Sequence, residues 1–394
     1  MFRTMQLASL LAAVALLTPQ LSAQLNFDVD GKEVQVHGFF SQGFADSNDN
    51  NYLTMKTSEG SFALTDMGLN ASVQLTDKFR VGAEVYDRNI GSLGNWQPIL
   101  DWAVADYRFK DWFGVRAGKV KTVLGLYTDS QDAEFLYTWA LLPQSTYPLD
   151  LRSTYASHVG GDVYGQIPLH RFGSLSYTGY YGSVPYDKYG GFYYTLDDAG
   201  LPPTSFNTSM GGFDLHWNTN VPGLAVGFSW ANVSSDVKGN YLLYHSPYSA
   251  QSDPNRVSVG YADFSHGKLH LAGEYRHTNG FQDFAALGQT SRNNYGDQSW
   301  FASVAYRLFS KLELGTYYSS YRTELAGPPA AQHIYDGAVT ARVDLTKFWV
   351  VKVEGHFMDG YGDIYSAHGF YSDTNPNGLA PRTNLVVVRT SWYF

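Results

Sequence analysis

Apolar and polar residues alternate one by one through long segments of this chain. Residues 79–88, 335–345 and 349–358 show the pattern clearly, with apolar or small residues at every second position. Successive side chains of a strand point to opposite faces of its sheet, so this period indicates a sheet with one apolar and one polar face. An apolar stripe with helical spacing occurs only around residues 129–142. The chain is therefore predicted to be all-β.

The alternating segments predict about sixteen strands. Most are close to the ~9–11 residues that a tilted strand needs to cross a membrane. The predicted strands are residues 34–44, 61–75, 78–88, 99–109, 112–120, 154–166, 173–182, 209–217, 223–231, 255–264, 268–277, 298–308, 311–320, 334–345, 348–358 and 383–394.

The predicted connections alternate between short and long along the whole chain. The short ones are residues 76–77, 110–111, 167–172, 218–222, 265–267, 309–310 and 346–347. The long ones are residues 45–60, 89–98, 121–153, 183–208, 232–254, 278–297, 321–333 and 359–382. A soluble all-β protein, the alternative, has no reason for this asymmetry. It is typical of outer-membrane barrels, which have short periplasmic turns and long extracellular loops.

The composition agrees with a barrel. Only 16% of residues are charged and 16% are aromatic, while the mean hydropathy is −0.26. A bundle of membrane helices would be more apolar, and a disordered chain would have fewer aromatic residues. A barrel needs apolar side chains only at every second residue, and aromatic rings form its two interfacial girdles.

The N-terminus predicts export. Residues 1–23 combine a basic residue, an apolar run at 7–17 and a small residue at Ala23, which is the pattern of a cleaved signal peptide. Residues 24–33 are then a short periplasmic segment and residues 34–394 form the barrel. The chain has no cysteine, which excludes disulfides and a lipid anchor at the cleavage site.

The last strand and the third long connection carry a resemblance to known families. The chain ends with Trp392 and Phe394 on the apolar phase of the strand, similar to the C-terminal signal that bacterial outer-membrane barrels present to the barrel assembly machinery. Sixteen strands with the longest connection after the fifth resemble the trimeric porins, whose third loop folds inward. This resemblance implies a homotrimer and a constriction loop at about residues 121–153.

The start of that loop is similar to the phosphate-selective (O/P-type) porins. Residues 117–126 read AGKVKTVLGL, where that family has Gly-x-x-Lys and then Pro-Phe-Gly-Leu. Val123 and Leu124 stand in place of Pro-Phe, and the loop lacks a cluster of arginines. Phosphate selectivity is therefore not carried over.

The expected fold is an all-β, transmembrane antiparallel β-barrel of about 16 strands with short periplasmic turns, long extracellular loops and an inward-folded third loop. Charged residues on the inward phase of the strands imply a water-filled interior at this strand number. We expect loop acids to face wall bases across the constriction, although cross-strand ion pairs and solvated or capping acids are the alternatives. The predicted constriction residues are Arg80, Arg88, Arg108, Arg116, Asp129, Asp132 and Glu134.

These features predict a passive channel for small hydrophilic solutes and ions, in contact with outer-membrane lipid. A substrate-specific channel for sugars or for organic or phosphate anions is the alternative. A barrel lipase or protease is more remote, because the histidines on the inward phase have no evident nucleophile beside them. No pattern for a cofactor, a metal ion or nucleic acid is found.

Overall fold

The computed structural model describes residues 25–324, 327–362 and 368–394 of the chain. The predicted signal peptide, residues 1–23, lies outside the described residues. Among the described helices, none is long and apolar enough to cross a membrane.

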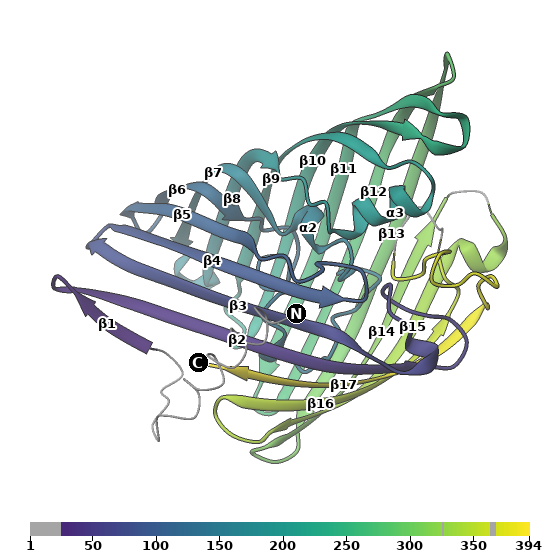
Figure 1. Ribbon diagram of the computed structural model, residues 1–394. Helices are drawn as coiled ribbons and strands as arrows, with labels where there is room; N and C mark the ends of the chain where they lie inside the picture. The colour runs from purple at the N-terminus through teal and green to yellow at the C-terminus, as the bar shows by residue number, and fades with distance from the viewer. Residues whose placement is uncertain (1–24, 325–326, 363–367) are drawn as a thin grey trace.

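Within the described residues, sixteen strands, β2 to β17, form one closed antiparallel barrel (Figure 1). Each strand pairs with its neighbours in sequence, and β17 closes the ring on β2, with Arg389 opposite Gly43. The strands are β2 (Lys32–Ser47), β3 (Ser61–Thr76), β4 (Phe79–Ile90), β5 (Ile99–Lys110), β6 (Phe113–Lys121), β7 (Ser157–Pro168), β8 (Ser174–Val184), β9 (Pro203–Asn218), β10 (Leu224–Tyr241), β11 (Ser246–His266), β12 (Leu269–Ala286), β13 (Gln289–Arg307), β14 (Leu312–Thr323), β15 (His333–Asp344), β16 (Trp349–Asp359) and β17 (Arg382–Tyr393). The predicted barrel of sixteen strands is confirmed.

A short additional strand, β1 (Leu25–Val29), lies in the segment predicted to precede the barrel. It forms a hairpin with the first residues of β2, where Leu25 is opposite Val36. The C-terminus meets β2 just above this hairpin, because Gly38 and Phe394 exchange backbone hydrogen bonds of 3.1 and 3.0 Å. The aromatic end of the chain is thus built into the closing seam.

The two ends of the barrel differ, and we call them the turn side and the loop side. On the turn side the strands are joined by tight turns. The loop side carries the longer connections and the helical segments, which are η1 (Thr57–Glu59), η2 (Glu134–Leu136), α2 (Arg152–Tyr155), α3 (Gly191–Asp198), η4 (Leu242–Tyr244) and η5 (Pro329–Ala331); η3 (His170–Phe172) is on the turn side.

Two predicted loops are wrong. Residues 232–254 and 278–297 are mostly strand, and they extend the β10–β11 and β12–β13 hairpins above the rest of the barrel (Figure 1). Helix α3 packs Phe192 and Leu196 against their inner face. The outer face of these two hairpins is polar, because it lies beyond the apolar band of the barrel. The extended strands therefore lack the apolar outward residues on which the strand prediction relied.

On the loop side the interior holds apolar clusters beside the predicted polar side chains. Four clusters of buried apolar side chains lie inside the barrel. In one of them, Met210 and Val259 point inward and pack against Leu124 of the third loop. In another, Leu64 and Ile90 of the wall meet Leu141 of the same loop. The hydrophobic core therefore lies between the wall and the loops that fold into it.

Candidate functional site

The third loop, residues 122–156 between β6 and β7, crosses the interior of the barrel; we call it loop 3. The Gly125 N–H donates to Ser229 of β10 at 2.9 Å. The N–H groups of Ala140 and Leu141 donate to the Glu354 carboxylate of β16 at 3.0 and 2.8 Å. Since β10 and β16 belong to different sides of the ring, loop 3 spans the lumen from wall to wall.

Two glycines permit this course. Gly125 has φ of 92°, and a side chain there would meet Glu274 Oε2 at 2.6 Å. Gly315 of β14 leaves room for Trp139, since a Cβ on Gly315 would lie 2.7 Å from the indole ring. Larger residues at either position would displace loop 3 from the wall.

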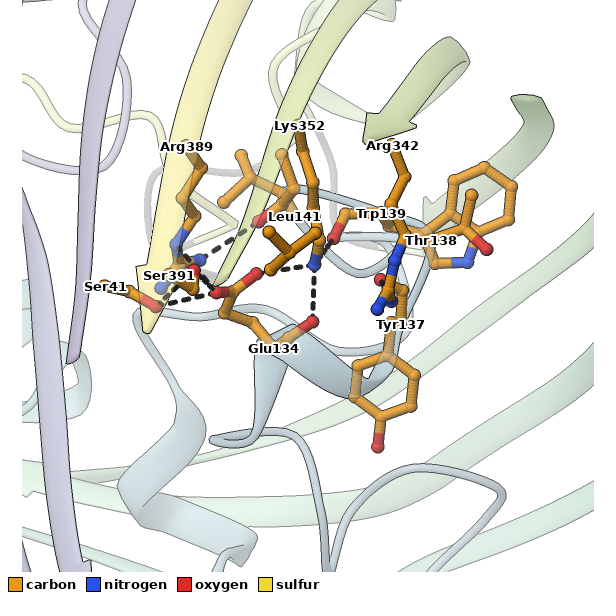
Figure 2. Close-up of polar contacts among 12 residues, drawn as sticks. Ser41, Glu134, Tyr137, Thr138, Trp139, Leu141, Arg342, Lys352, Arg389 and Ser391 are labelled. Atoms are coloured by element: carbon orange, nitrogen blue, oxygen red, sulfur yellow. Dashed lines mark hydrogen bonds and ion pairs between the residues drawn. The ribbon is translucent and has the colours of Figure 1, made fainter. Parts of the chain in front are cut away.

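Glu134 holds the middle of loop 3 to the closing seam (Figure 2). Its Oε2 lies 2.6 Å from Lys352 Nζ, and its Oε1 lies 3.9 Å from Arg389 Nε. The hydroxyls of Ser41 and Ser391 donate to Oε1. We call these five residues the Glu134 anchor.

The Glu134 anchor is a buried charge network. The side chains of Glu134, Lys352 and Arg389 are 6%, 1% and 3% exposed. Burial opposes ionisation of Glu134, but the charges of Lys352 and Arg389 outweigh it and lower its pKa to about 2. Lys352 Nζ also donates to the carbonyl oxygens of Glu134 and Trp139. This arrangement fixes the loop backbone as well as its carboxylate.

A second charge network holds both ends of loop 3. Asp132 Oδ2 lies 2.9 Å from Lys121 Nζ and 3.4 Å from Arg152 Nη2, and both cations also contact Asp101 of β5, at 2.5 and 2.9 Å. Burial opposes ionisation of Asp132, but Lys121 and Arg152 outweigh it and hold its pKa well below the ordinary value. With Glu84, these residues form what we call the carboxylate cluster.

The carboxylate cluster has the composition of a cation site. One oxygen each of Glu84, Asp101 and Asp132 lies within 4.8 Å of the others, and all three residues are buried. The Lys121 ammonium and the Arg152 guanidinium already supply the compensating charge. These two cations pair with Asp101 and Asp132, so the protein's own groups compensate two of the three carboxylates.

The structure separates Arg88 from the other predicted constriction arginines. Arg80, Arg108 and Arg116 lie on the neighbouring strands β4, β5 and β6, where Asp106 is opposite both Arg80 and Arg116. Arg80 is exposed on the turn side and bonds Ser72 at 2.7 Å. Arg88 donates to the Leu149 carbonyl of loop 3 at 2.8 Å and lies 3.8 Å from Asp187.

Two further predicted arginines lie on β5 and β6. Arg108 lies 6.0 Å and Arg116 4.7 Å from the centre of the Tyr164 ring. Arg116 pairs with Asp162 at 2.8 Å. Among the described ion pairs, none joins these residues to a loop acid.

Among the described ion pairs, the predicted wall arginines are not the partners of the loop 3 acids. Asp132 pairs with Lys121 and Arg152, while Glu134 pairs with Lys352 and Arg389. Asp129 is exposed, and Ser130 is its hydrogen-bond donor at 3.2 Å.

The alternation of residues along a strand identifies which side chains point into the barrel. It does not give their height in the barrel, and it does not show which part of the wall a loop reaches. The inward phase of Lys352 and Arg389 on their strands identified them as interior side chains. No sequence pattern did the same for Lys121 and Arg152.

The aromatic side chains of loop 3 pack against the wall. Tyr127, Trp139 and Tyr147 are buried in one cluster with Phe301 and Tyr317 of β13 and β14. The Trp139 and Tyr317 rings meet edge to face at 5.1 Å between centroids. These rings thus hold the loop in place rather than forming an exposed stacking surface.

The interior histidines are bonded to groups other than serine. His356 lies 2.9 Å from Asp336 and 3.0 Å from Glu354, and His158 lies 3.0 Å from Thr122. Among the described hydrogen bonds, none joins a histidine to a serine hydroxyl. No serine nucleophile with an adjacent base is therefore assembled in the part of the chain that the structure describes.

Asp150 connects loop 3 to the connection after β16, residues 360–381, which we call loop 8. The Gly369 N–H and the Tyr371 hydroxyl donate to its Oδ2 at 2.9 and 2.7 Å. Burial raises the pKa of Asp150 from 3.8 to about 6, against the lowering effect of these bonds. Asp150 is therefore protonated in the packed arrangement below about pH 6.

This shift predicts that loop 8 binds loop 3 more tightly in acid. The stabilising contribution is fully present below the ordinary pKa of 3.8 and is lost as the pH rises through about 6. The shift corresponds to about 3 kcal/mol. We expect cleavage of loop 8 by chymotrypsin, divided at each pH by its rate on a peptide substrate, to accelerate up to about pH 6 and to change little above it. Asp150→Asn should abolish this dependence, whereas Asp373→Asn, at an exposed position of loop 8, should retain it.

No family model matches the sequence, and no curated protein matches it either. Solved structures do. OmpF of Salmonella typhi, in complex with daunomycin, is similar with a TM-score of 0.59 and 12% identity, over 94% of this chain and 100% of that one. OmpT of Vibrio cholerae gives a TM-score of 0.58 and 11% identity, over 94% and 100%.

A porin of stated anion selectivity has the same architecture. The anion-selective porin of Comamonas acidovorans gives a TM-score of 0.55 and 12% identity, over 92% of this chain and 100% of that one. The barrel has the fold of the bacterial porins. Identities this low concern the fold alone, so solute and selectivity have to be argued from the chain's own residues.

Proposed function

We propose that the chain is an outer-membrane porin that forms a narrow channel for passive diffusion of small hydrophilic solutes and ions. The observation that carries the proposal is a closed barrel of sixteen strands crossed by a loop that paired charges hold inside it. A barrel of this size has room for an aqueous passage. Loop 3 and the loop-side clusters take up much of that room, so the passage is narrow.

The turn-side interior supports a polar route. Its wall carries partly exposed ionisable side chains, among them Arg116, His270 and Arg307, which are 27%, 38% and 32% exposed. Most are paired, as Arg307 is with Glu313 at 2.7 Å and Asp344 at 2.5 Å. Balanced wall charge of this kind favours neutral or weakly charged solutes.

The substrate-specific alternative is a channel for sugars or for organic or phosphate anions. A narrow passage favours it over an unselective pore. Arg80, Arg108 and Arg116 lie on the neighbouring strands β4, β5 and β6, but acids stand between them. Asp106 is opposite both Arg80 and Arg116, and Asp162 pairs with Arg116 at 2.8 Å. The bases that an anion channel would need are thus largely balanced. Sugars are therefore the better candidates within this alternative.

Conductance in a planar bilayer tests the proposal. We expect ohmic single-channel steps smaller than those of a wide general porin, with a reversal potential near zero in a salt gradient. Block of the current by a sugar but not by phosphate would favour the specific channel. Absence of any conductance at neutral pH would contradict the porin function. Release of fatty acid or peptide by the pure protein would favour the barrel enzyme instead.

A homotrimer is the proposed assembly. The outward positions of neighbouring strands carry small side chains, which let sheets from two subunits approach closely; they are Val81, Ala83, Ala103, Ala105, Val115, Ala117 and Gly161. The neighbouring strand β6 is also short, at 9 residues. A trimer form is known for Vibrio cholerae OmpT, which is similar with a TM-score of 0.52 and 11% identity. Channel closure in groups of three steps would support the trimer.

The proposed location follows from the barrel surface and the chain ends. Trp349 and Trp392 stack at 5.5 Å beside the closing seam, as expected for an interfacial aromatic girdle. The signal peptide at residues 1–23 and recognition of Trp392 and Phe394 by the barrel assembly machinery complete the proposal. Removal of Phe394 should reduce the amount of folded barrel in the membrane.

A further inference from the structure

Two charged side chains of opposite sign project from the outer surface of the barrel. On β4, Tyr86 and Arg88 are buried inside, so Asp87 between them points outward. On β6, Val120 is buried inside, and Lys119 next to it points outward. Both residues are half-buried, at positions where a barrel normally presents apolar groups to lipid.

Neither charge is paired within its own subunit. Among the described ion pairs, none includes Asp87 or Lys119, and Asp87 Oδ1 is buried without a hydrogen-bond partner. The Lys119 ammonium donates to the carbonyl oxygen of Leu100. An ammonium has three donors, so two of them remain for another acceptor.

The two charges are too far apart to pair with each other in one chain. Lys119 is directly opposite Ala103, and Ala103 is directly opposite Ala83. Asp87 lies four residues further along β4. Two strand spacings make about 10 Å and four residues make about 13 Å, so the two α-carbons are about 16 Å apart. An aspartate and a lysine side chain cannot bridge that distance, so each charge needs a partner from outside its own chain.

The two charges lie at similar heights on the outer surface. Asp87 is eight residues along β4 from Phe79. Lys119 is six residues along β6 from Phe113. These two phenylalanines begin their strands and belong to the aromatic contacts of the turn side. On β5, which separates β4 from β6, the outward residue opposite Lys119 is Ala103. This small side chain lets a second surface approach both charges.

From these observations we infer that Asp87 of one subunit forms an ion pair with Lys119 of the partner subunit. A lipid phosphate would bind Lys119 but repel Asp87, whereas a second copy of this chain supplies the opposite charge to both. In a ring of three identical chains, the β4 side of each subunit meets the β6 side of the next, and all the pairs are satisfied. The inference rests on the proposed homotrimer and names the contact that determines which strands face the neighbour.

Cross-linking of introduced cysteines tests which surfaces meet. The chain has no cysteine of its own, so no background reaction is expected. Asp87→Cys combined with Lys119→Cys, in the full-length protein in mild detergent, should give covalent dimers and trimers and nothing larger. The reagent is a bifunctional thiol cross-linker much shorter than the ~16 Å between the two positions of one chain. Either cysteine alone can join two chains at most and should give no trimer.

A cysteine pair on another part of the wall is the matched control. Val304 and Val339 are exposed outward residues of β13 and β15, which are also separated by one strand. Val304→Cys combined with Val339→Cys should give no covalent trimer. Absence of covalent trimers from the Asp87 and Lys119 positions, or equal yields from the control, would overturn the inference.

Exchange of the two charges tests the ion pair itself. Asp87→Lys or Lys119→Asp alone places like charges face to face, so the oligomer should dissociate on heating in detergent at a temperature at which the wild type stays intact. The double variant restores opposite charges and should regain that resistance. Arg322→Asp, which changes an exposed residue of β14, should behave like the wild type.

Light scattering in detergent measures the oligomer in each of these variants. A double variant no more resistant than the single variants would overturn the inference, and so would a monomeric wild type. The first result is the one expected if a lipid phosphate binds Lys119 instead. Conductance of the same samples tests the porin function separately, because the exchanged residues lie outside the lumen.

Discussion

Replacing Glu134 by alanine should raise the single-channel conductance several-fold and destabilise the barrel. The carboxylate is the acceptor for Lys352 Nζ at 2.6 Å and for the Ser41 hydroxyl at 2.6 Å. Without it, the described partners of the buried Lys352 cation are backbone carbonyls alone, whereas Arg389 keeps Asp66 at 2.6 Å. Breaking one side of a buried ion pair costs about 3–5 kcal/mol. The middle of loop 3 should then leave the wall and widen the passage.

Planar-bilayer conductance and thermal unfolding followed by circular dichroism measure the two effects of Glu134→Ala. The variant Glu134→Leu combined with Lys352→Met removes both charges. It should regain stability, because no buried charge is left unpaired. Asp283→Ala removes a carboxylate outside the lumen and should change neither quantity. Wild-type conductance in Glu134→Ala would show that the anchor does not set the width of the passage.

Sequence patterns predicted the barrel because lipid imposes a strict rule on it. Every second residue of a strand inside the membrane must be apolar, and Val351, Val353 and Phe357 of β16 obey that rule. Beyond the membrane the rule no longer applies. The upper parts of β10 to β13 are polar on their outer face and were therefore predicted as loops.

The sequence predicted which loop carries the charged site, but not which residues contact one another there. The acids of loop 3 at Asp132 and Glu134 are where the charge networks form. Their partners depend on the path of the loop across the lumen, and that path is set by contacts such as Trp139 against Gly315. Lys352 is 218 residues from Glu134 in the sequence, and no local pattern connects them.

Replacing Arg152 by methionine should destabilise the barrel as strongly as the loss of Glu134. Its guanidinium lies 2.9 Å from Asp101 and 3.4 Å from Asp132, and 4.2 Å from the centre of the Tyr86 ring. Its side chain is 1% exposed, so water cannot replace these contacts. Among the described ion pairs of the carboxylate cluster, those of Lys121 with Asp101 and Asp132 would then be the only ones left. The loss expected for a broken buried network is about 3–5 kcal/mol.

Calcium should restore part of the stability of Arg152→Met. Calcium binds carboxylate oxygens, and the three carboxylates of the cluster already present oxygens within 4.8 Å of one another. The unfolding temperature of the variant should therefore rise with added calcium, and Tb³⁺ bound there should give luminescence sensitised by Tyr86. The wild-type protein should respond neither to calcium nor to a chelator, because Lys121 and Arg152 fill the position of the ion. Arg292→Met, at an exposed pair, is the control for lost charge. Equal stabilisation of wild type and variant by calcium would show that the ion acts elsewhere on the barrel.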